Sequence, residues 1–234
     1  EGFGMLVARR AALLASAVAS INLRPLRTEA MQVETKKPLI GVLSTLLPGQ
    51  GDRMADADPL DAIAWDAPKI RGLTTEQMAA RINSGLRERG WFVTGEGLPE
   101  LFSAGFKFSD PDVSIDGIEL YCRQVRRLFD QNTARCEVVC CSVTAANTIT
   151  IVWRNSGKVN IGPLGFDLKP YVVTTTLRTD PPDGLVAYQE DAFEVNGPEL
   201  LMYQVPVLRN FISPPAPSVE ELQQRYGCVF PLDV

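Results

Sequence analysis

The stretch LFSAGFKFSDPDVSIDGIELY, residues 101–121, contains the join between a strand and a helix that decides the fold. Phe106 and Phe108 are two residues apart, as on one face of a strand. Asp110-Pro111 ends that strand, because proline lacks a backbone N–H and restricts the residue before it. From Asp116 onward apolar residues recur at helical spacing. The stretch therefore predicts a short strand followed at once by a helix.

Another helix is predicted on the N-terminal side of this strand. Thr74 and Gln77 have the spacing of a capping box, and Leu73 and Met78 have that of a hydrophobic staple. The apolar stripe that follows ends at Gly90, a residue type typical of a helix C-terminus. We therefore expect a helix from Thr74 to Gly90.

The pattern changes to a period of two after Asn132. Four β-branched, alternating segments follow, separated by turn residues such as Asn155-Ser156-Gly157. They are ARCEVVCCSVTA (134–145), NTITIVWRN (147–155), KPYVVTTTLRTD (169–180) and GLVAYQEDAFEV (184–195). Strands that follow helices indicate an α+β domain, a curved antiparallel sheet with helices packed on one face.

The segment VNIGPLGFDLKP, residues 159–170, is rich in glycine and proline, as phosphate-binding loops are. It lacks the Lys-Ser/Thr pair of a P-loop and does not lead into a helix, so it predicts a hairpin or crossover loop. Lys158 and Lys169 are then expected to be surface charges.

Charge and length limit the classes of function. The chain has 234 residues, 45% of them hydrophobic, which is enough for one domain with extensions. Residues 1–50 carry six Lys/Arg and three Asp/Glu, whereas the remaining residues carry 17 and 25. This acidic body argues against a nucleic-acid-binding domain, which needs a basic face.

The absence of histidine limits the chemistry further. It removes the usual general base, the commonest nitrogen ligand of metals and every Ser-His or Cys-His pair. The five cysteines have no C-x-x-C spacing, and we predict no metal site. We interpret the cysteines as small buried hydrophobes, with a link from Cys228 to the body of the domain as an alternative.

Extensions flank the predicted domain on both sides. Residues 1–30 contain a twin arginine and an apolar run from Ala11 to Ile21 that is too short to span a bilayer, which is typical of either an export signal or a docking helix. Residues 31–71 are interpreted as a linker or as an extended arm along a partner. The anchors of that arm would be Leu46, Leu47, Leu60, Ile63 and Trp65. Residues 213–234 combine a proline hinge, a short helix and a tail that we expect to dock.

The order of elements resembles the SnoaL-like branch of the nuclear transport factor 2-like superfamily, and is most similar to its uncharacterised plant, algal and cyanobacterial group. The motifs that carry the resemblance are FKFSDP (106–111), DGIELY (116–121), IVWRNSGKV (151–159) and DGLVAYQEDAFEVN (183–196). The resemblance covers about residues 72–212 and implies a conical domain there. The superfamily includes isomerases, dehydratases and cyclases, and also members that only bind proteins, so the fold does not fix the function.

The resemblance also implies candidate catalytic residues inside the cone. Family enzymes place an Asp there, often with a His or Tyr, and the matching residues are Asp110 and Asp191, with Tyr121 and Tyr188 as phenolic partners. Asp191 shares the more apolar face of the last strand, so we expect it to point inward, where desolvation raises the pKa of a carboxyl group. A hydrogen-bonded structural acid is the alternative. The missing histidine departs from the dehydratase and cyclase pattern.

Two functions follow as expectations. The first is a non-enzymatic accessory subunit whose arms dock the cone onto protein subunits of a photosynthetic, photosystem-type membrane complex. It would be peripheral to the thylakoid of a plastid, without a transmembrane helix, and the twin arginine favours the lumen over the stroma. The second is a protein that binds a small apolar ligand, or an isomerase-like enzyme with an Asp/Tyr pair. No cofactor is predicted, a bound pigment or lipid is compatible with the cone, and a homodimer through the outer sheet face is compatible with both functions.

Overall fold

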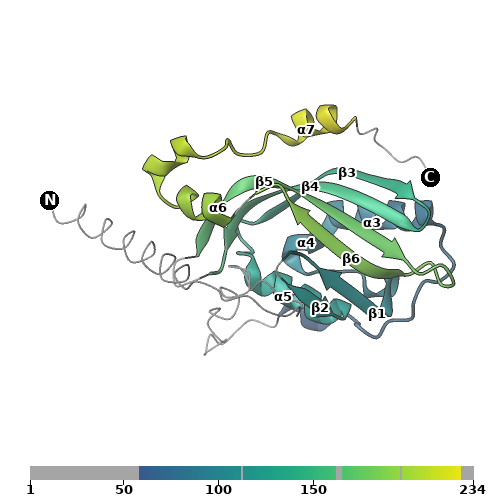
Figure 1. Cartoon of the computed structure of the whole chain (residues 1–234). Coiled ribbons are helices and arrows are strands. Elements are labelled where there is room, and N and C mark those ends of the chain that lie inside the picture. Colours follow the sequence, from purple (N-terminus) through teal and green to yellow (C-terminus); the bar gives the residue numbers. More distant parts are fainter. Residues whose placement is uncertain (1–57, 112, 162–164, 196, 228–234) are drawn as a thin grey trace, which may run out of the picture. The chain divides into compact units, whose positions relative to one another are not determined.

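Helices surround a central sheet in the structure, a computed structural model that describes residues 58–111, 113–161, 165–195 and 197–227 (Figure 1). The helices before the sheet are η1 (Pro59–Ala62), α3 (Thr75–Arg89), α4 (Trp91–Thr94) and η2 (Pro99–Leu101). α5 (Ile118–Leu128) lies between the second and third strands. The helices after the sheet are α6 (Gly197–Tyr203), η3 (Pro206–Phe211) and α7 (Val219–Tyr226).

The sheet is curved and has six strands in the order β2-β1-β6-β5-β4-β3. Its strands are β1 (Phe102–Ser109), β2 (Ser114–Asp116), β3 (Arg135–Ala145), β4 (Thr148–Val159), β5 (Phe166–Thr179) and β6 (Val186–Phe193). The α+β prediction is confirmed. The sheet is mixed rather than wholly antiparallel, because β1 pairs with β6 in parallel. No hairpin joins these two strands, and the chain reaches β6 only after the whole β3–β5 meander.

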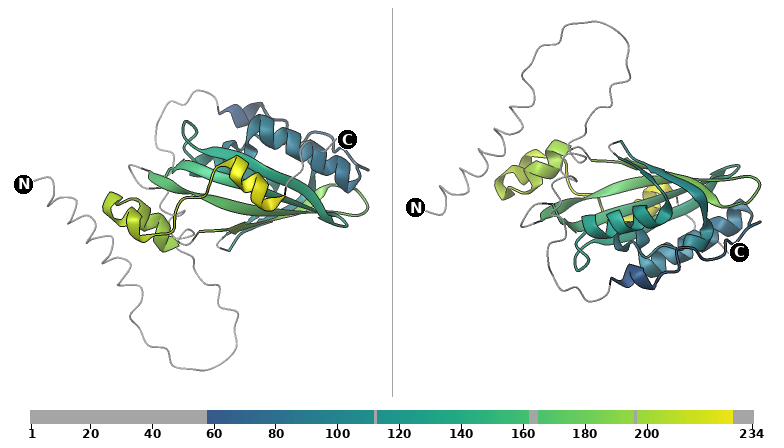
Figure 2. Two further views of the ribbon diagram at one scale, coloured as in Figure 1. Left: turned by 90° about the horizontal axis from the view of Figure 1, so that it is seen from above. Right: turned by 90° about the horizontal axis from the view of Figure 1, so that it is seen from below.

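The main core lies between one face of the sheet and α3, α4 and α5 (Figures 1 and 2). Trp91, Phe92 and Phe102 are among its fully buried side chains. The sequence predicted helices on one face only, whereas α7 lies on the opposite face and packs Leu222 against the side chains of Val139, Val152 and Val172. The homodimer through the outer face stays a prediction, and α7 occupies the part of that face around these valines.

The local signals of α3 are confirmed. Thr74 Oγ1 accepts a hydrogen bond from the Gln77 amide at 3.2 Å, and Gln77 Oε1 accepts one from the Thr74 amide at 3.1 Å. Gly90 ends the helix in the left-handed region, with φ 59°. These contacts satisfy backbone groups that the first and last turns leave without partners inside the helix.

Asn155-Ser156-Gly157 does not form the turn that its composition predicts. These residues lie within β4, where the register with β5 shifts between Asn155 and Gly157. Such a shift marks a β-bulge. Gly157 has φ 108°, and a Cβ there would lie 2.3 Å from the carbonyl oxygen of Thr133. The hairpin comes later: Val159 pairs with Phe166, as predicted for residues 159–170.

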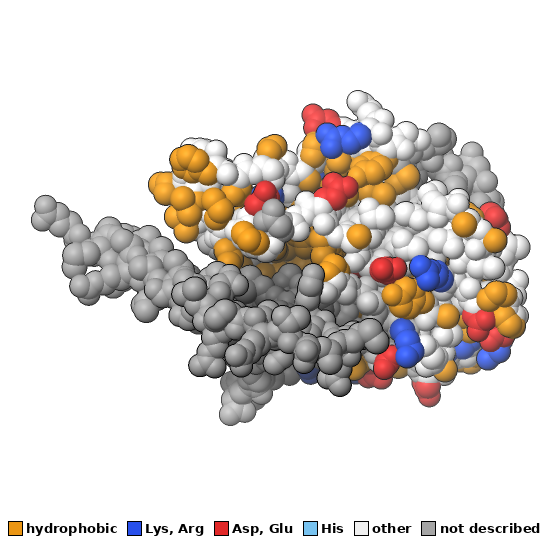
Figure 3. Space-filling view, in the orientation of Figure 1, with side chains coloured by type: hydrophobic (Ala, Val, Ile, Leu, Met, Phe, Trp, Pro, Cys, Tyr) orange, Lys and Arg blue, Asp and Glu red, His pale blue; other side chains and the backbone are white. Residues whose placement is uncertain are grey.

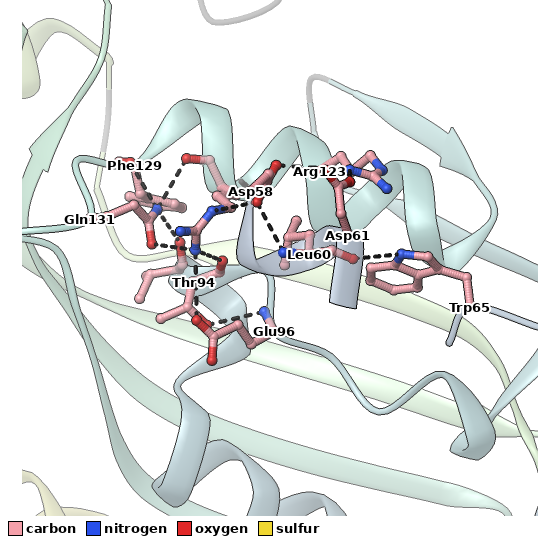
Figure 4. Close-up of polar contacts among 11 residues, drawn as sticks. Asp58, Leu60, Asp61, Trp65, Thr94, Glu96, Arg123, Phe129 and Gln131 are labelled. Carbon is pink, nitrogen blue, oxygen red and sulfur yellow. Dashed lines mark hydrogen bonds and ion pairs between the residues drawn. The ribbon is translucent and has the colours of Figure 1, made fainter. Parts of the chain in front are cut away.

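Residues 58–71 belong to the domain rather than to an arm. Leu60 is fully buried, and the Trp65 indole donates a hydrogen bond to the Leu60 carbonyl at 3.1 Å (Figure 4). Leu60 is therefore buried within this domain, and the prediction that it anchors a partner is wrong. Trp65 is half-buried and packs against the main core. The error arose because the local pattern does not show whether an isolated apolar residue is buried in its own domain or against a partner. Ile63 is half-buried, and Leu46 and Leu47 lie outside the described residues.

Ion pairs hold the same segment against α5. The guanidinium of Arg123 lies 3.0 Å from Asp61, and that of Arg126 lies 3.1 Å from Asp58 (Figure 4). The described part of the domain therefore begins at residue 58, ahead of the predicted boundary at residue 72.

One cysteine differs from its interpretation as a free hydrophobe. Cys140 is disulfide-bonded, whereas Cys122, Cys136 and Cys141 are free. Cys228, for which a link to the domain was the alternative, lies outside the described residues.

The helices of the described residues lack the length and apolar character that are needed to cross a membrane.

Candidate functional site

The cone is hollow. Its cavity has a volume of about 980 Å³, within the range of pockets that enclose small molecules. Side chains from all strands except β3 line it, and α4, α5 and α6 contribute others. Its aromatic lining residues are Phe92, Phe108, Tyr121, Phe129, Trp153, Phe166, Tyr171 and Phe193. A cavity of this size can hold a ligand of drug-like dimensions, so large side chains do not plug the cone.

Asp191 lines this cavity and is only 7% exposed. It lies on β6, beside Thr175 of β5. The Thr175 hydroxyl donates to Asp191 Oδ1 at 2.7 Å and accepts a hydrogen bond from the Trp153 indole at 3.0 Å. Gln189 Nε2 also donates to Oδ1, at 3.3 Å. Among the described residues both hydrogen bonds end on Oδ1, which leaves Oδ2 for a ligand.

The carboxyl group of Asp191 gains and loses its proton near neutral pH. Burial raises the pKa of its carboxyl group from the ordinary 3.8 to about 7, because desolvation disfavours the charged form more than the hydrogen bonds from Thr175 and Gln189 favour it. A carboxyl group with such a pKa can accept a proton from a ligand and return it.

Three more polar side chains surround the carboxyl group. Asn155 Nδ2 donates to the Tyr171 hydroxyl at 2.9 Å, and Gln189 Nε2 donates to the Tyr121 hydroxyl at 3.0 Å. Burial raises the pKa of both tyrosines, so they stay protonated and can donate. Asn155 is 1% exposed and lines the cavity, and its Oδ1 has no hydrogen-bond partner among the described residues.

The structure brings together some of the predicted site residues and separates others. Asp191 points inward as predicted, and Tyr121 reaches it through Gln189. Asp110 lines the cavity, and its Oδ1 accepts the Val113 amide at 2.6 Å, as in an Asx-type turn.

Tyr188 does not belong to the site. Its ring lies 5.3 Å from the Arg178 guanidinium, and strand alternation places it opposite to Gln189 and Asp191. The predicted pair of Asp191 with Tyr188 is therefore wrong, and Tyr121 is the nearer phenol.

Sequence reasoning missed Asn155, Tyr171 and Thr175. The alternation of β4 could have placed Asn155 on the same face as Trp153, but the Asn-Ser-Gly triplet was interpreted as a turn. Tyr171 and Thr175 share a face of β5 in the same way.

Lys169 is a second correction. It was expected at the surface but is 2% exposed. Its ammonium group contacts the carboxylate of Glu199 and the Ser213 hydroxyl, the latter at 2.6 Å. Lys169 lowers the pKa of Glu199 through this hydrogen bond. The pair therefore ties α6, which lines the cavity, to β5.

Within the described ranges, no group of three or more Cys, Asp and Glu side chains is arranged to hold a metal ion.

Comparison with known proteins finds structural neighbours only. No family model and no curated protein matches the chain. The matching solved structures include a protein with a ketosteroid isomerase-like fold from Catenulispora acidiphila, 17% identical, covering 57% of this chain and 97% of that one, with a TM-score of 0.40. A nuclear transport factor 2-like protein from Burkholderia thailandensis is 15% identical, covering 53% and 92%, with a TM-score of 0.41. A SnoaL-like protein from Jannaschia is 16% identical, covering 55% and 92%, with a TM-score of 0.40.

The described residues form a curved, mixed six-stranded sheet with helices packed against it, which is the α+β architecture that was predicted. The α+β class is thus confirmed, whereas the nuclear transport factor 2-like cone and the similarity to the plant, algal and cyanobacterial group stay predictions.

Proposed function

We propose that the cone binds a small, mainly apolar molecule in its cavity and that Asp191 exchanges a proton with it. The observation that carries this proposal is a buried carboxyl group of near-neutral pKa among the aromatic side chains of a cavity of about 980 Å³.

The arrangement suits an isomerase-like reaction or reversible binding. Trp153 and Thr175 fix Oδ1 of Asp191, so Oδ2 meets the ligand. A carboxylate there removes a proton from one position of the ligand, and the resulting carboxylic acid returns it to another. The protonated phenol of Tyr121 or Tyr171 donates to an oxygen of the ligand that becomes negative. The chemistry needs no histidine, because one carboxyl group of raised pKa serves as base and as conjugate acid.

Titration calorimetry with 2-naphthylmethanol tests the binding. We expect saturable binding at one site of the full chain. Val125 lines the cavity, so Val125→Phe should fill part of it and weaken binding by about tenfold or more. Val207→Phe is the matched control, because Val207 is 70% exposed. Absence of saturable binding, or equal affinity for both variants, would overturn the proposal.

A second candidate function retains the predicted docking role. The α6–η3 segment exposes Val207 by 70% and Phe211 by 78%, and hydrophobic side chains gather over it (Figure 3). Residues 200–219 contain a single charged residue, Arg209. Exposed apolar patches of this kind mark interaction sites. This surface supports a docking role. That the partner is a photosynthetic membrane complex of the thylakoid, and that the chain is related to the plant, algal and cyanobacterial group, stay predictions from the sequence.

Gentle solubilisation of native membranes, followed by a sizing gradient, tests this docking role. Migration with a pigment-bearing complex, lost in the double variant Val207→Ser, Phe211→Ser, is the expected result. Recovery of the unmodified chain only as a small soluble species would exclude it. Glu220→Gln, on α7, is a control that leaves the exposed apolar side chains in place.

A further inference from the structure

The charges around the cavity are all of one sign. Asp110, Asp116, Asp167 and Asp191 line it, and no Lys or Arg is among its described lining residues. The ammonium nitrogen of Lys107 lies 3.5 Å from the Asp116 carboxylate, and that of Lys158 lies 3.5 Å from the Asp167 carboxylate. These two lysines do not line the cavity, but they offset the charges of two acids that do. The hydrogen-bond partners of Asp191, by contrast, are the neutral side chains of Thr175 and Gln189.

We infer that the ligand of this cavity is a cation, an apolar amine whose ammonium group lies against Asp191 and the neighbouring aromatic rings. This inference rests on the proposed binding function and names the class of ligand. An apolar carboxylate would meet acids and no base, and burying a second negative charge beside Asp191 is unfavourable. A neutral ligand would leave the ionised form of Asp191 without a partner of opposite sign, whereas an ammonium group supplies one.

The unpaired polar atoms of the site favour the same class. Asn155 Oδ1 is buried without a partner among the described residues, and Asp191 Oδ2 receives no hydrogen bond from them. Both are acceptors, so a ligand must bring donors to satisfy them. An ammonium group supplies up to three N–H donors.

The aromatic lining supplies the second mode of recognition of a cation. Tyr171 and Phe193 pack edge to face with ring centroids 6.2 Å apart, and Phe108 and Tyr121 lie 4.7 Å apart. All four rings line the cavity. Aromatic faces attract cations, most strongly where water is excluded. The same rings bury the hydrocarbon part of the ligand.

Binding of a cation must also release a proton. Four titratable groups interact electrostatically with Asp191. Burial raises the pKa of Tyr121, Tyr171 and Cys136, which keeps them protonated at neutral pH. The charge of Asp191 raises the pKa of these three groups further, and the charge of Asp110 adds to the effect of burial on the pKa of Asp191. An ammonium group beside Asp191 favours its ionised form, so the amine displaces the proton of this carboxyl group.

Three probes that share one ring system test the ligand class on the full chain. They are 2-naphthylmethylamine, 2-naphthylmethanol and 2-naphthoic acid, compared by titration calorimetry between about pH 6 and pH 8 in buffers of different ionisation enthalpy. We expect the amine to bind about tenfold more tightly than the alcohol at the upper pH, and the acid to bind more weakly than both. The affinity for the amine should rise with pH and its binding should release a proton, whereas that for the alcohol should not rise.

A pair of isosteric variants separates the outcomes. Asp191→Asn should abolish the preference for the amine and the release of the proton while the alcohol still binds. Glu190→Gln lies on the same strand but is exposed, and should change neither. Equal affinity for the amine and the alcohol in the unmodified chain would overturn the cationic class and leave the binding function standing. Failure of all three probes would overturn both.

Discussion

Asp191 owes its properties to its position on a strand. Its neighbours Glu190 and Ala192 face outward and are exposed, whereas Asp191 lies under the aromatic lining of the cavity. Period-two alternation was enough to predict this inward orientation from the sequence, because the pattern around residue 191 is unbroken.

The stability of the chain should therefore depend on Asp191 and pH together. An acid whose pKa is higher in the folded state binds more protons when folded, so stability is lost as pH rises from about 4 to about 7. Asp191→Asn should remove this dependence. We expect its free energy of unfolding, relative to the unmodified chain, to increase by on the order of 3 kcal/mol between about pH 4 and pH 8, measured by urea unfolding.

Glu190→Gln is the control for this measurement, because Glu190 is exposed on the opposite face. Its pH profile should follow that of the unmodified chain. A parallel profile for Asp191→Asn as well would show that the folded chain does not raise the pKa of this carboxyl group.

Replacing Lys169 or Lys158 tests how burial changes the contribution of a lysine ion pair to stability. Lys169→Met removes a buried ammonium group that contacts Glu199, and should lower the free energy of unfolding by about 2 to 3 kcal/mol. Lys158→Met removes one partner of an exposed pair with Asp167, and should change it by less than about 0.5 kcal/mol. Thermal unfolding followed by circular dichroism measures both. Equal effects would contradict the burial of Lys169.

The sequence predicted residue roles unevenly. Asp191 and Tyr121 came from strand alternation and a motif, whereas the partners Thr175 and Asn155 depend on how three strands align. Lys169 shows the same limit: its burial follows from contacts with Glu199 and Ser213, which come 30 and 44 residues later in the chain. The hydrophobic pattern of the neighbouring sequence does not indicate contacts with residues so far along the chain.

At the scale of elements, local interactions were predicted well and irregular pairing was not. α3 begins and ends where the Thr74 cap and Gly90 indicate, because those contacts span only a few residues. The β-bulge of β4 was missed because the residue types that favour a bulge also favour a turn.

The bulge requires glycine at position 157, because a side chain there would clash with the backbone of Thr133. Gly157→Ala places a Cβ 2.3 Å from the Thr133 carbonyl oxygen at φ 108°, so backbone must move. We expect a loss of about 3 kcal/mol or more in the free energy of unfolding. Gly105→Ala in β1 meets no atom within 4 Å and should change it by less than about 1 kcal/mol. Urea titration of both variants checks this, and a tolerated Gly157→Ala would argue against the bulge.

At the scale of the molecule, the domain begins earlier than the sequence indicated. Compared with a chain of residues 58–234, a chain of residues 72–234 lacks the buried Leu60 and the partners of Arg123 and Arg126. We expect the shorter chain to unfold roughly 10 °C lower in differential scanning calorimetry. The single variant Leu60→Ala should show a smaller decrease in the same direction. Identical unfolding temperatures would return the boundary to residue 72.

The helix on the outer face has a consequence for self-association. α7 reaches Val139, Val152 and Val172 through the proline-rich residues 213–218, so it competes for this surface as part of the same molecule. A short tether gives such a segment an effective concentration on the order of millimolar. A second copy of the chain, at ordinary protein concentrations, competes at a disadvantage for the same valines. The C-terminal segment therefore covers the part of the outer face around these valines, and we expect pairing of two copies through that part to require that α7 leave it.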